Sequence, residues 1–154
     1  GENIAWGSPG ASQEDIQQAA QVAQADSFVS ASPRGYNTYV AEGGASLSGG
    51  QKQRVPIARA VIKPAEIFIF DDSTTALDLK TEAPLYDALD NSRYQATKLI
   101  VAQRVASVRR ANRILVLENG RIVGCGPHQE LLRTCPAYQD IYHSQLGEED
   151  ELHE

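Results

Sequence analysis

The sequence contains no methionine and only two cysteines among its 154 residues. Cys125 and Cys135 are too few for a disulfide-stabilised scaffold, which favours a reducing compartment. A zinc site made of these cysteines with His128 and His143 has spacings that match no common zinc pattern. No apolar run approaches the roughly 18 residues needed to span a bilayer. The opening residues, GENIAWGSPG, lack the layout of a signal peptide.

Positive charge is also scarce. The chain has 14 Lys and Arg against 20 Asp and Glu, a net charge of −6. This balance argues against a nucleic-acid-binding surface, so no nucleic-acid partner is expected. Part of the negative charge lies in EEDELHE at the end of the sequence, which we interpret as a solvated acidic tail.

The sequence further lacks a phosphate-cradling loop of the form G-x-x-x-x-G-K-[ST]. Gly44 and Gly49 have the required separation, but Gly50 stands where the lysine is needed. This chain by itself is therefore not expected to hold nucleotide phosphates in such a loop.

What is present predicts an α/β fold with a mainly parallel sheet, because apolar strands alternate with helices. IFIF is a short, fully apolar run that predicts a buried parallel strand, and TKLIVAQ predicts a second buried strand. Asn-Gly at 119–120 predicts a hairpin turn. Ser12 with Asp15 resembles a helix capping box in which an aspartate replaces the usual glutamate. The expected helices cover residues 12–25, 50–61, 78–91, 105–111, 127–134 and 136–146, the strands cover 67–70 and 97–103, the hairpin covers 113–126, and 27–46 is loop-like.

Two prolines conflict with these helices. Pro56 and Pro84 lie inside predicted helices, where a proline loses a backbone hydrogen bond and costs about 3 kcal/mol. Either the helices are kinked there or their boundaries differ.

The stretch LSGGQ, residues 47–51, predicts an anion-contacting turn at the start of a helix. Glycine lets a backbone approach a ligand without a Cβ in the way. The unpaired N–H groups and the dipole of the first helical turn favour negative charge there. A plain loop-to-helix turn is the alternative. The serine before the glycines and Gln-Lys-Gln-Arg after Gly50 favour the anion site.

Two acids, Asp71 and Asp72, follow the first apolar strand. Carboxylates at the end of a buried strand are costly unless positive charge meets them. A magnesium ion with nucleotide phosphates would supply that charge. A helix cap or surface turn is the alternative. Because open α/β sheets bind ligands at the carboxyl ends of their strands, the metal interpretation is favoured.

These stretches occur in register with others. LSGGQ (47–51), IFIFD (67–71), TALD (75–78) and LIVAQR (99–104) resemble the signature, Walker B strand, D-loop and switch loop of an ABC transporter nucleotide-binding domain. ENIAWG (2–7) and RILVLENGRIVGCGPHQELL (113–132) resemble its exporter branch. The resemblance covers almost the whole chain. It implies the second half of a P-loop NTPase-like ABC ATPase core with an α-helical signature subdomain.

The resemblance implies ATP and Mg²⁺ as ligands and a role for each matching residue. Asp71 would hold the magnesium, usually through water. Asp72 stands where the family has its catalytic glutamate, and Gln103 stands where it has the switch histidine. The signature residues would contact the γ-phosphate of ATP bound to the opposite subunit: Leu47, Ser48, Gly49, Gly50 and Gln51.

Two further segments of the family would serve communication. Asp78, in the D-loop, would link the two nucleotide sites. TYVAEGG, Thr38–Gly44, resembles the loop that contacts the transmembrane domain, with Glu42 as the expected contact. The partners implied are a second nucleotide-binding domain and the transmembrane domain of an exporter, at the cytoplasmic face of the cell membrane.

Two departures from the family pattern fall on one site. Asp72 is one methylene shorter than glutamate, which retracts its carboxylate by about 1.5 Å, and a misplacement of about 1 Å can cost about a hundredfold in rate. Gln103 can hydrogen-bond a phosphate but cannot carry a proton or a positive charge. LSGGQ is intact. We therefore expect one degenerate and one competent ATP site in a heterodimeric exporter. A homodimer that tolerates Asp and Gln is the alternative.

We expect a helical subdomain over 1–64, the later part of the catalytic core over 65–147 and the acidic tail over 148–154. The phosphate loop and the adenine-stacking aromatic of the family would lie before Gly1. This chain alone should then bind ATP poorly, hydrolyse none, and expose apolar sheet surface. Two other classes stay open: a soluble ABC ATPase without a membrane domain, and a non-catalytic interaction module.

Overall fold

The computed structural model describes residues 1–94 and 96–151, which form two compact units. The first unit spans residues 1–101, and the second begins at residue 102. Buried side chains of the first unit include Leu85 and Leu89, and those of the second include Val105 and Leu131. Each unit therefore has an apolar core of its own.

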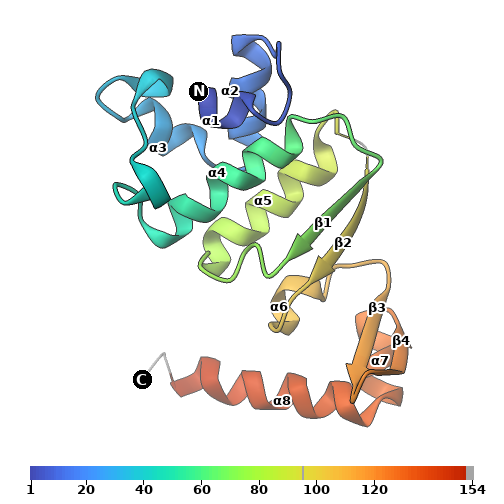
Figure 1. Cartoon of the computed structure of the whole chain (residues 1–154). Coiled ribbons are helices and arrows are strands. Elements are labelled where there is room, and N and C mark those ends of the chain that lie inside the picture. The colour runs from blue at the N-terminus through green and yellow to red at the C-terminus, as the bar shows by residue number, and fades with distance from the viewer. Residues whose placement is uncertain (95, 152–154) are drawn as a thin grey trace. The chain divides into compact units, whose positions relative to one another are not determined.

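The first unit combines helices with a parallel strand pair. Strands β1 (Ile67–Asp71) and β2 (Thr97–Val101) pair in parallel, with Asp71 opposite Val101. The helices are α1 (Glu2–Ala5), α2 (Gln13–Val22), α3 (Asp26–Ser30), α4 (Gly49–Val61) and α5 (Leu79–Asn91), with 3₁₀ turns η1 (Gly35–Asn37) and η2 (Glu42–Gly44). Helices α4 and α5 run beside the strand pair (Figure 1). The predicted α/β class with parallel strands is confirmed.

Strand β1 buries one face, and the corresponding face of β2 is half-buried, so the predicted burial is found on one side of the strands only. Phe68 and Phe70 are buried, whereas Ile67 and Ile69 are 60% and 66% exposed. In β2, Leu99 and Val101 are also about half exposed on the corresponding face. Both faces of the β1–β2 pair carry apolar side chains, but only one face is covered by the residues that the structure describes. The expected exposure of apolar sheet surface is confirmed.

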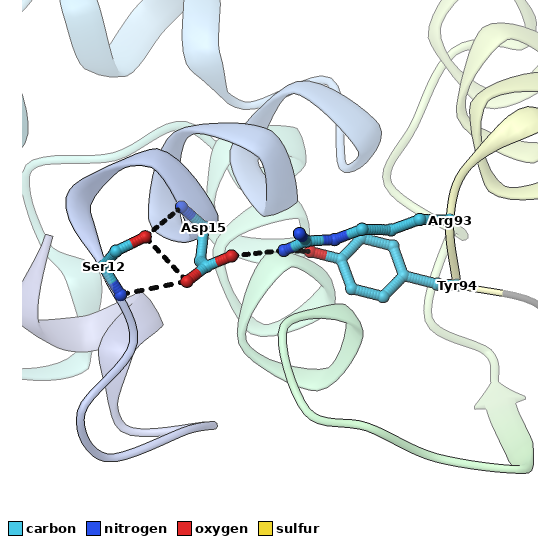
Figure 2. A network of polar contacts seen from close by, with 4 residues as sticks. All are labelled: Ser12, Asp15, Arg93 and Tyr94. Carbon is cyan, nitrogen blue, oxygen red and sulfur yellow. Dashed lines mark hydrogen bonds and ion pairs between the residues drawn. The ribbon is translucent and has the colours of Figure 1, made fainter.

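Helix α2 begins at a capping box that is joined to a distant loop (Figure 2). The hydroxyl of Ser12 accepts the N–H of Asp15 at 3.1 Å, and the Asp15 carboxylate accepts the N–H of Ser12 at 3.0 Å. Arg93 donates to the same carboxylate at 2.5 Å and lies over the ring of Tyr94. Hydrogen bonds from Arg93, and then from Ser12, lower the pKa of Asp15 to about 2. The predicted capping box is confirmed, and the Arg93 contact ties α2 to the loop before β2.

The region after α2 differs from the prediction. The helix expected over 12–25 ends at Val22, because Gln24 takes a left-handed backbone with φ +56°. Helix α3 then begins inside the stretch predicted to be loop-like. Asp26 accepts hydrogen bonds from the hydroxyls of Ser30 and Tyr36, which stabilise this short helix. Residues 27–46 are interspersed with Ser, Gly, Pro and Asn, which favour loops, so the sequence pattern does not reveal the short helix that these side-chain contacts stabilise.

The two prolines lie inside continuous helices. Helix α4 contains Pro56 and α5 contains Pro84, and both side chains are exposed. On an exposed helix face, water can hydrogen-bond the carbonyl that the proline ring displaces. The predicted boundaries of both helices therefore agree with the structure to within one residue.

The second unit consists of a hairpin and short helices followed by a longer one. Its elements are α6 (Val105–Val108), β3 (Ile114–Glu118), β4 (Arg121–Gly126), α7 (His128–Thr134) and α8 (Pro136–Glu151). Asn119 and Gly120 have φ of +49° and +75°, as the two central residues of the predicted hairpin turn require. Strands β3 and β4 pair antiparallel, which confirms the hairpin.

Helix α8 extends beyond its predicted end at residue 146 and includes part of the stretch interpreted as an acidic tail. Glutamate is a good helix former, so acidic composition alone did not mark the end of the helix. Residues 152–154, also assigned to that tail, lie outside the described residues. Across the residues that are described, no helix is both long and apolar enough to cross a membrane.

Candidate functional site

The signature stretch forms the beginning of α4, and Ser48 is its N-cap. The Ser48 hydroxyl accepts the N–H of Gln51 at 3.3 Å, and the Gln51 side chain accepts the N–H of Ser48 at 3.1 Å. This is a second capping box. The Ser-x-x-Gln spacing is typical of a capping box, but a box was predicted from the sequence only at Ser12. The turn that was predicted to meet an anion is thus fixed by its own side chains.

Two backbone N–H groups of this turn are available as hydrogen-bond donors. The N–H groups of Gly49 and Gly50 have no hydrogen-bond acceptor among the described residues, as expected for the first turn of a helix. Ser48 and Gly49 are exposed, whereas Leu47 and Gly50 are half-buried. An anion at the end of this 13-residue helix could therefore accept bonds from two backbone amides and one hydroxyl.

Gly50 also permits close packing inside the chain. A Cβ at this position would lie 3.2 Å from the carbonyl oxygen of Ala76 and 3.4 Å from the side chain of Leu77. The start of α4 therefore packs closely against the loop that follows β1. The glycines were expected to let a ligand approach the backbone, and this internal contact is an additional reason for glycine at residue 50.

Gln53 connects the same two segments by hydrogen bonds. Its amide nitrogen donates to the hydroxyl of Thr75 at 2.9 Å, and its amide oxygen accepts the N–H of Ala76 at 2.8 Å. The structure thus joins the signature helix directly to TALD, the predicted D-loop. The sequence analysis did not single out Gln53, because its role depends on the tertiary approach of the two segments.

Asp78 begins the next helix. Its carboxylate accepts the N–H of Thr81 at 2.7 Å, which makes it the N-cap of α5. Hydrogen bonding to Thr81 holds the pKa of Asp78 below its ordinary value, and the charges of Arg54 and Lys80 add to this. Asp78 therefore stays ionised at neutral pH and fixes the end of the D-loop.

Two residues that the sequence analysis did not assign anchor this region from inside. The hydroxyl of Thr74 donates to the buried carboxylate of Glu82 at 2.6 Å. Arg54 donates to the carbonyl of Gln24 at 2.6 Å, and its guanidinium lies 4.9 Å from the ring centroid of Phe28. Burial lowers the pKa of Arg54, and the nearby charge of Asp78 opposes this shift. Both contacts hold the loop and α4 against neighbouring helices.

Asp71 and Asp72 lie at the carboxyl end of β1 and are exposed. Asp72 extends the parallel pairing by donating its N–H to Val101 at 3.0 Å, and its backbone is left-handed with φ +46°. Among the described residues, no group of three or more His, Cys, Asp or Glu side chains could hold a metal. The two adjacent carboxylates supply the hard oxygen ligands that suit Mg²⁺ when water and phosphate oxygens complete its coordination.

Gln103 belongs to the second unit, where its side chain is exposed. Its backbone carbonyl accepts a hydrogen bond from the side chain of Gln145 at 2.8 Å. The structure thus brings the predicted signature and D-loop together within the first unit, and Gln103, the predicted switch residue, belongs to the second.

The predicted membrane-domain loop, Thr38–Gly44, is an irregular segment that ends in η2. Gly43 and Gly44 have φ of +63° and +67°, a region that favours glycine. Tyr39 is 75% exposed and Glu42 is exposed. The segment therefore presents an aromatic ring and a carboxylate on the surface.

The sequence matches a family model described as ABC transporter over residues 2–75. It is 47% identical, over 96% of its length, to an uncharacterized ABC transporter ATP-binding protein of Bacillus subtilis. It is 46% identical, over 94% of its length, to an ATP-dependent lipid A-core flippase of Saccharophagus degradans. A solved structure of a bacterial Atm1-family ABC exporter with ATP bound matches 94% of the chain with a TM-score of 0.89 and 38% identity.

The chain belongs to the ABC transporter family. It spans about a quarter of its relatives' length: 26% of the Bacillus protein, 25% of the flippase and 25% of the Atm1-family exporter chain. The fold is that of an ABC ATPase core with helical and parallel-strand parts, as the resemblance implied. The names of these relatives describe an ATP-binding protein, an ATP-dependent flippase and an exporter.

Proposed function

We propose that this chain is part of the ATP-binding subunit of an ABC exporter. Its signature, Leu47–Gln51, completes a nucleotide site on a partner subunit, and its own site, with Asp71, Asp72 and Gln103, is degenerate. The observation that supports this most is the start of α4. There an exposed serine and two amides without acceptors among the described residues face outward from a preformed turn.

The proposed division of labour follows from side-chain chemistry. Asp71 would hold Mg²⁺, which neutralises phosphate charge when ATP is bound. Asp72 has a short carboxylate on a left-handed backbone, and Gln103 has no titratable group. A water molecule at this site would be activated poorly, so ATP would be retained and turned over slowly. The partner's site would receive Ser48, Gly49 and Gly50 of this chain.

Two variants of the full-length subunit in the assembled transporter test the proposal. Ser48→Arg places a bulky cation in the signature and should reduce ATP turnover by about a hundredfold or more. Asp72→Asn should change turnover by less than about threefold, since that site contributes little. Turnover lost equally in both variants would contradict the asymmetric assignment, and a homodimer that tolerates Asp and Gln would then fit better.

Ser12→Arg is the matched control for the helix cap. Ser12 is the N-cap of α2 with the same reciprocal capping box as Ser48. Loss of such a cap typically costs about 0.5–2 kcal/mol. If Ser12→Arg reduced turnover as much as Ser48→Arg, the effect would reflect lost folding stability and the proposed contact would be wrong.

The segment Thr38–Gly44 is proposed to contact the transmembrane domain, with Glu42 as the contacting side chain. Its surface position and the exposed ring of Tyr39 support this assignment. Glu42→Ala should leave ATP binding unchanged and weaken the coupling of hydrolysis to transport in the assembled protein. Transport and hydrolysis measured side by side would reveal this, and an unchanged ratio would contradict the assignment.

We also propose that the 154-residue chain alone binds ATP weakly and hydrolyses none, because its sequence contains no G-x-x-x-x-G-K-[ST] loop. Equilibrium dialysis with ATP and Mg²⁺ measures this directly. Micromolar binding by the chain alone would contradict the proposal.

A further inference from the structure

The switch position of the second unit is held by a side chain from α8. The amide oxygen of Gln145 accepts the N–H of Val105 at 2.8 Å. The amide nitrogen of Gln145 donates to the carbonyl of Gln103 at 2.8 Å. One half-buried side chain thus makes two hydrogen bonds to the backbone on either side of Arg104, across about forty residues of sequence.

These hydrogen bonds satisfy two backbone groups at the start of α6, the N–H of Val105 and the carbonyl of Gln103. Val105 is the first residue of α6, and the N-cap of that helix, Arg104, makes no capping hydrogen bond with its side chain. The first N–H groups of a helix require acceptors from outside the helix. Gln145 supplies one of these acceptors and also occupies the carbonyl of Gln103, so the backbone of Gln103 is fixed by a residue outside its own loop.

The helix that carries Gln145 is itself firmly held. Tyr138 is buried, and its hydroxyl lies 2.8 Å from Nδ1 of His128. The side chain of Gln139 donates to the carbonyl of Leu132 at 2.8 Å. Val105, Leu131 and Tyr138 share the core of this unit. Gln145 therefore projects from an anchored helix.

We infer that Gln145 is a positioning residue: it holds the backbone at Gln103 so that the Gln103 side chain is presented to the terminal phosphate of bound ATP. This inference rests on the proposed role of Gln103 in the nucleotide site. It extends that site to α8, because a displacement of this helix would release or reorient the switch residue. No contact between Gln145 and nucleotide is required.

Three variants of the full-length subunit, in the assembled transporter, test the inference. Gln145→Leu keeps the approximate size and removes both hydrogen bonds. Gln145→Glu keeps the acceptor for the N–H of Val105 and removes the donor to Gln103. Gln139→Leu is the matched control, since it removes an amide-to-carbonyl bond from the same helix without touching residues 103–105.

Hydrogen–deuterium exchange of peptides that cover residues 103–108 is the first measurement. The loss of a hydrogen bond to an amide should speed its exchange by about five- to tenfold. We expect this in Gln145→Leu, a smaller change in Gln145→Glu, and no change in Gln139→Leu. Unchanged exchange in Gln145→Leu, or an equal increase in Gln139→Leu, would overturn the positioning role.

A double-mutant cycle with Gln103→Ala is the second measurement. Gln145→Leu should raise the dissociation constant for ATP at this subunit's site by about two- to tenfold and leave kcat of the transporter nearly unchanged. In the Gln103→Ala background the same change should have no further effect. Additive effects would overturn the inference. A silent Gln103→Ala would instead overturn the role of Gln103 and with it the nucleotide part of the inference, while exchange still decides whether Gln145 holds the loop.

Discussion

Asp72 combines an uncommon backbone conformation with a short carboxylate. Its φ of +46° lies in the left-handed region, which Asp and Asn tolerate better than most other residues. The backbone at this position thus favours a short acid such as aspartate. Function and local conformation at the end of β1 therefore have to be separated by substitution.

We expect Asp72→Val to lower the free energy of unfolding by about 1–2 kcal/mol, because a β-branched side chain is strained in this conformation. Asp72→Asn should be nearly neutral, since Asn tolerates the same backbone. Urea denaturation of both variants provides the comparison. Equal stability of Asp72→Val and the unsubstituted protein would show that the left-handed backbone costs nothing here.

Asp15 gives a pH-dependent prediction at the same scale. Its pKa is lowered to about 2 by Arg93 and Ser12, so the folded state holds the ionised form more strongly than the unfolded chain does. The stabilising contribution should be complete above about pH 4 and disappear as the pH falls towards 2. NMR titration of the carboxyl should follow this, and Arg93→Gln should raise the pKa of Asp15. If the pKa of Asp15 stayed at about 2 in Arg93→Gln, the ion pair would contribute little to the lowering of that pKa.

Sequence patterns correctly predicted the turns and caps that depend on residues close together along the chain. The hairpin turn at Asn119-Gly120 and the capping box at Ser12 follow from residue types at fixed spacing, and both are found. Helix α3 escaped prediction because its stability depends on side chains that meet after the chain folds. Exposed apolar sheet surface was expected from the resemblance, but composition does not reveal which face of β1 is covered.

In the candidate site, too, the positions of motif residues were predictable from the sequence, whereas contacts between distant segments were not. The motif order placed Ser48, Asp71 and Asp78 on the correct elements, at the start of α4, the end of β1 and the cap of α5. The Gln53 bridge and the Gln145 contacts lay beyond the sequence, because each joins segments that are distant along the chain.

Helix α5 should become more stable without its interior proline. Pro84→Ala restores an N–H that can bond the carbonyl of residue 80 and removes the ring clash. The free energy of unfolding should rise by about 1–2 kcal/mol, because the greater conformational freedom of the unfolded Ala variant offsets part of the benefit. Thermal or urea unfolding measures the change. Pro136→Ala is the control, since Pro136 is the first residue of α8, where proline is well tolerated. Equal gains in both variants would argue against an interior-helix cost.

The bridge between α4 and the D-loop gives a second prediction for the elements. Gln53→Leu should speed amide exchange of Ala76 by about five- to tenfold, because the acceptor of that N–H is lost. Gln53→Glu retains an acceptor and should preserve most of the protection. Exchange measured by NMR or mass spectrometry distinguishes these outcomes. Equal protection in both variants would mean that packing at Gly50 alone holds the loop.

At the scale of the whole molecule, the uncovered side of β1 and β2 carries several exposed apolar side chains. We call the exposed residues Ile67, Ile69, Leu99 and Val101 the open sheet face. Apolar patches of this kind promote association in water. We expect the 154-residue chain to self-associate at high concentration in sedimentation velocity.

Ile69→Lys should reduce this association by placing a charge within the open sheet face. Tyr39→Lys is the control, since Tyr39 is at least as exposed as Ile69 (75% against 66%) but lies outside that face. A clean monomer at millimolar concentration would contradict the prediction, as would equal relief of association by both variants.

The reciprocal bonds of Ser48 and Gln51 have a thermodynamic consequence for recognition. This turn is already closed by its own side chains. If it binds a nucleotide of another subunit, as proposed, little conformational entropy would be lost on contact, and more of the interaction energy would remain available for affinity. The capping box would then preorganise the helix end for that ligand.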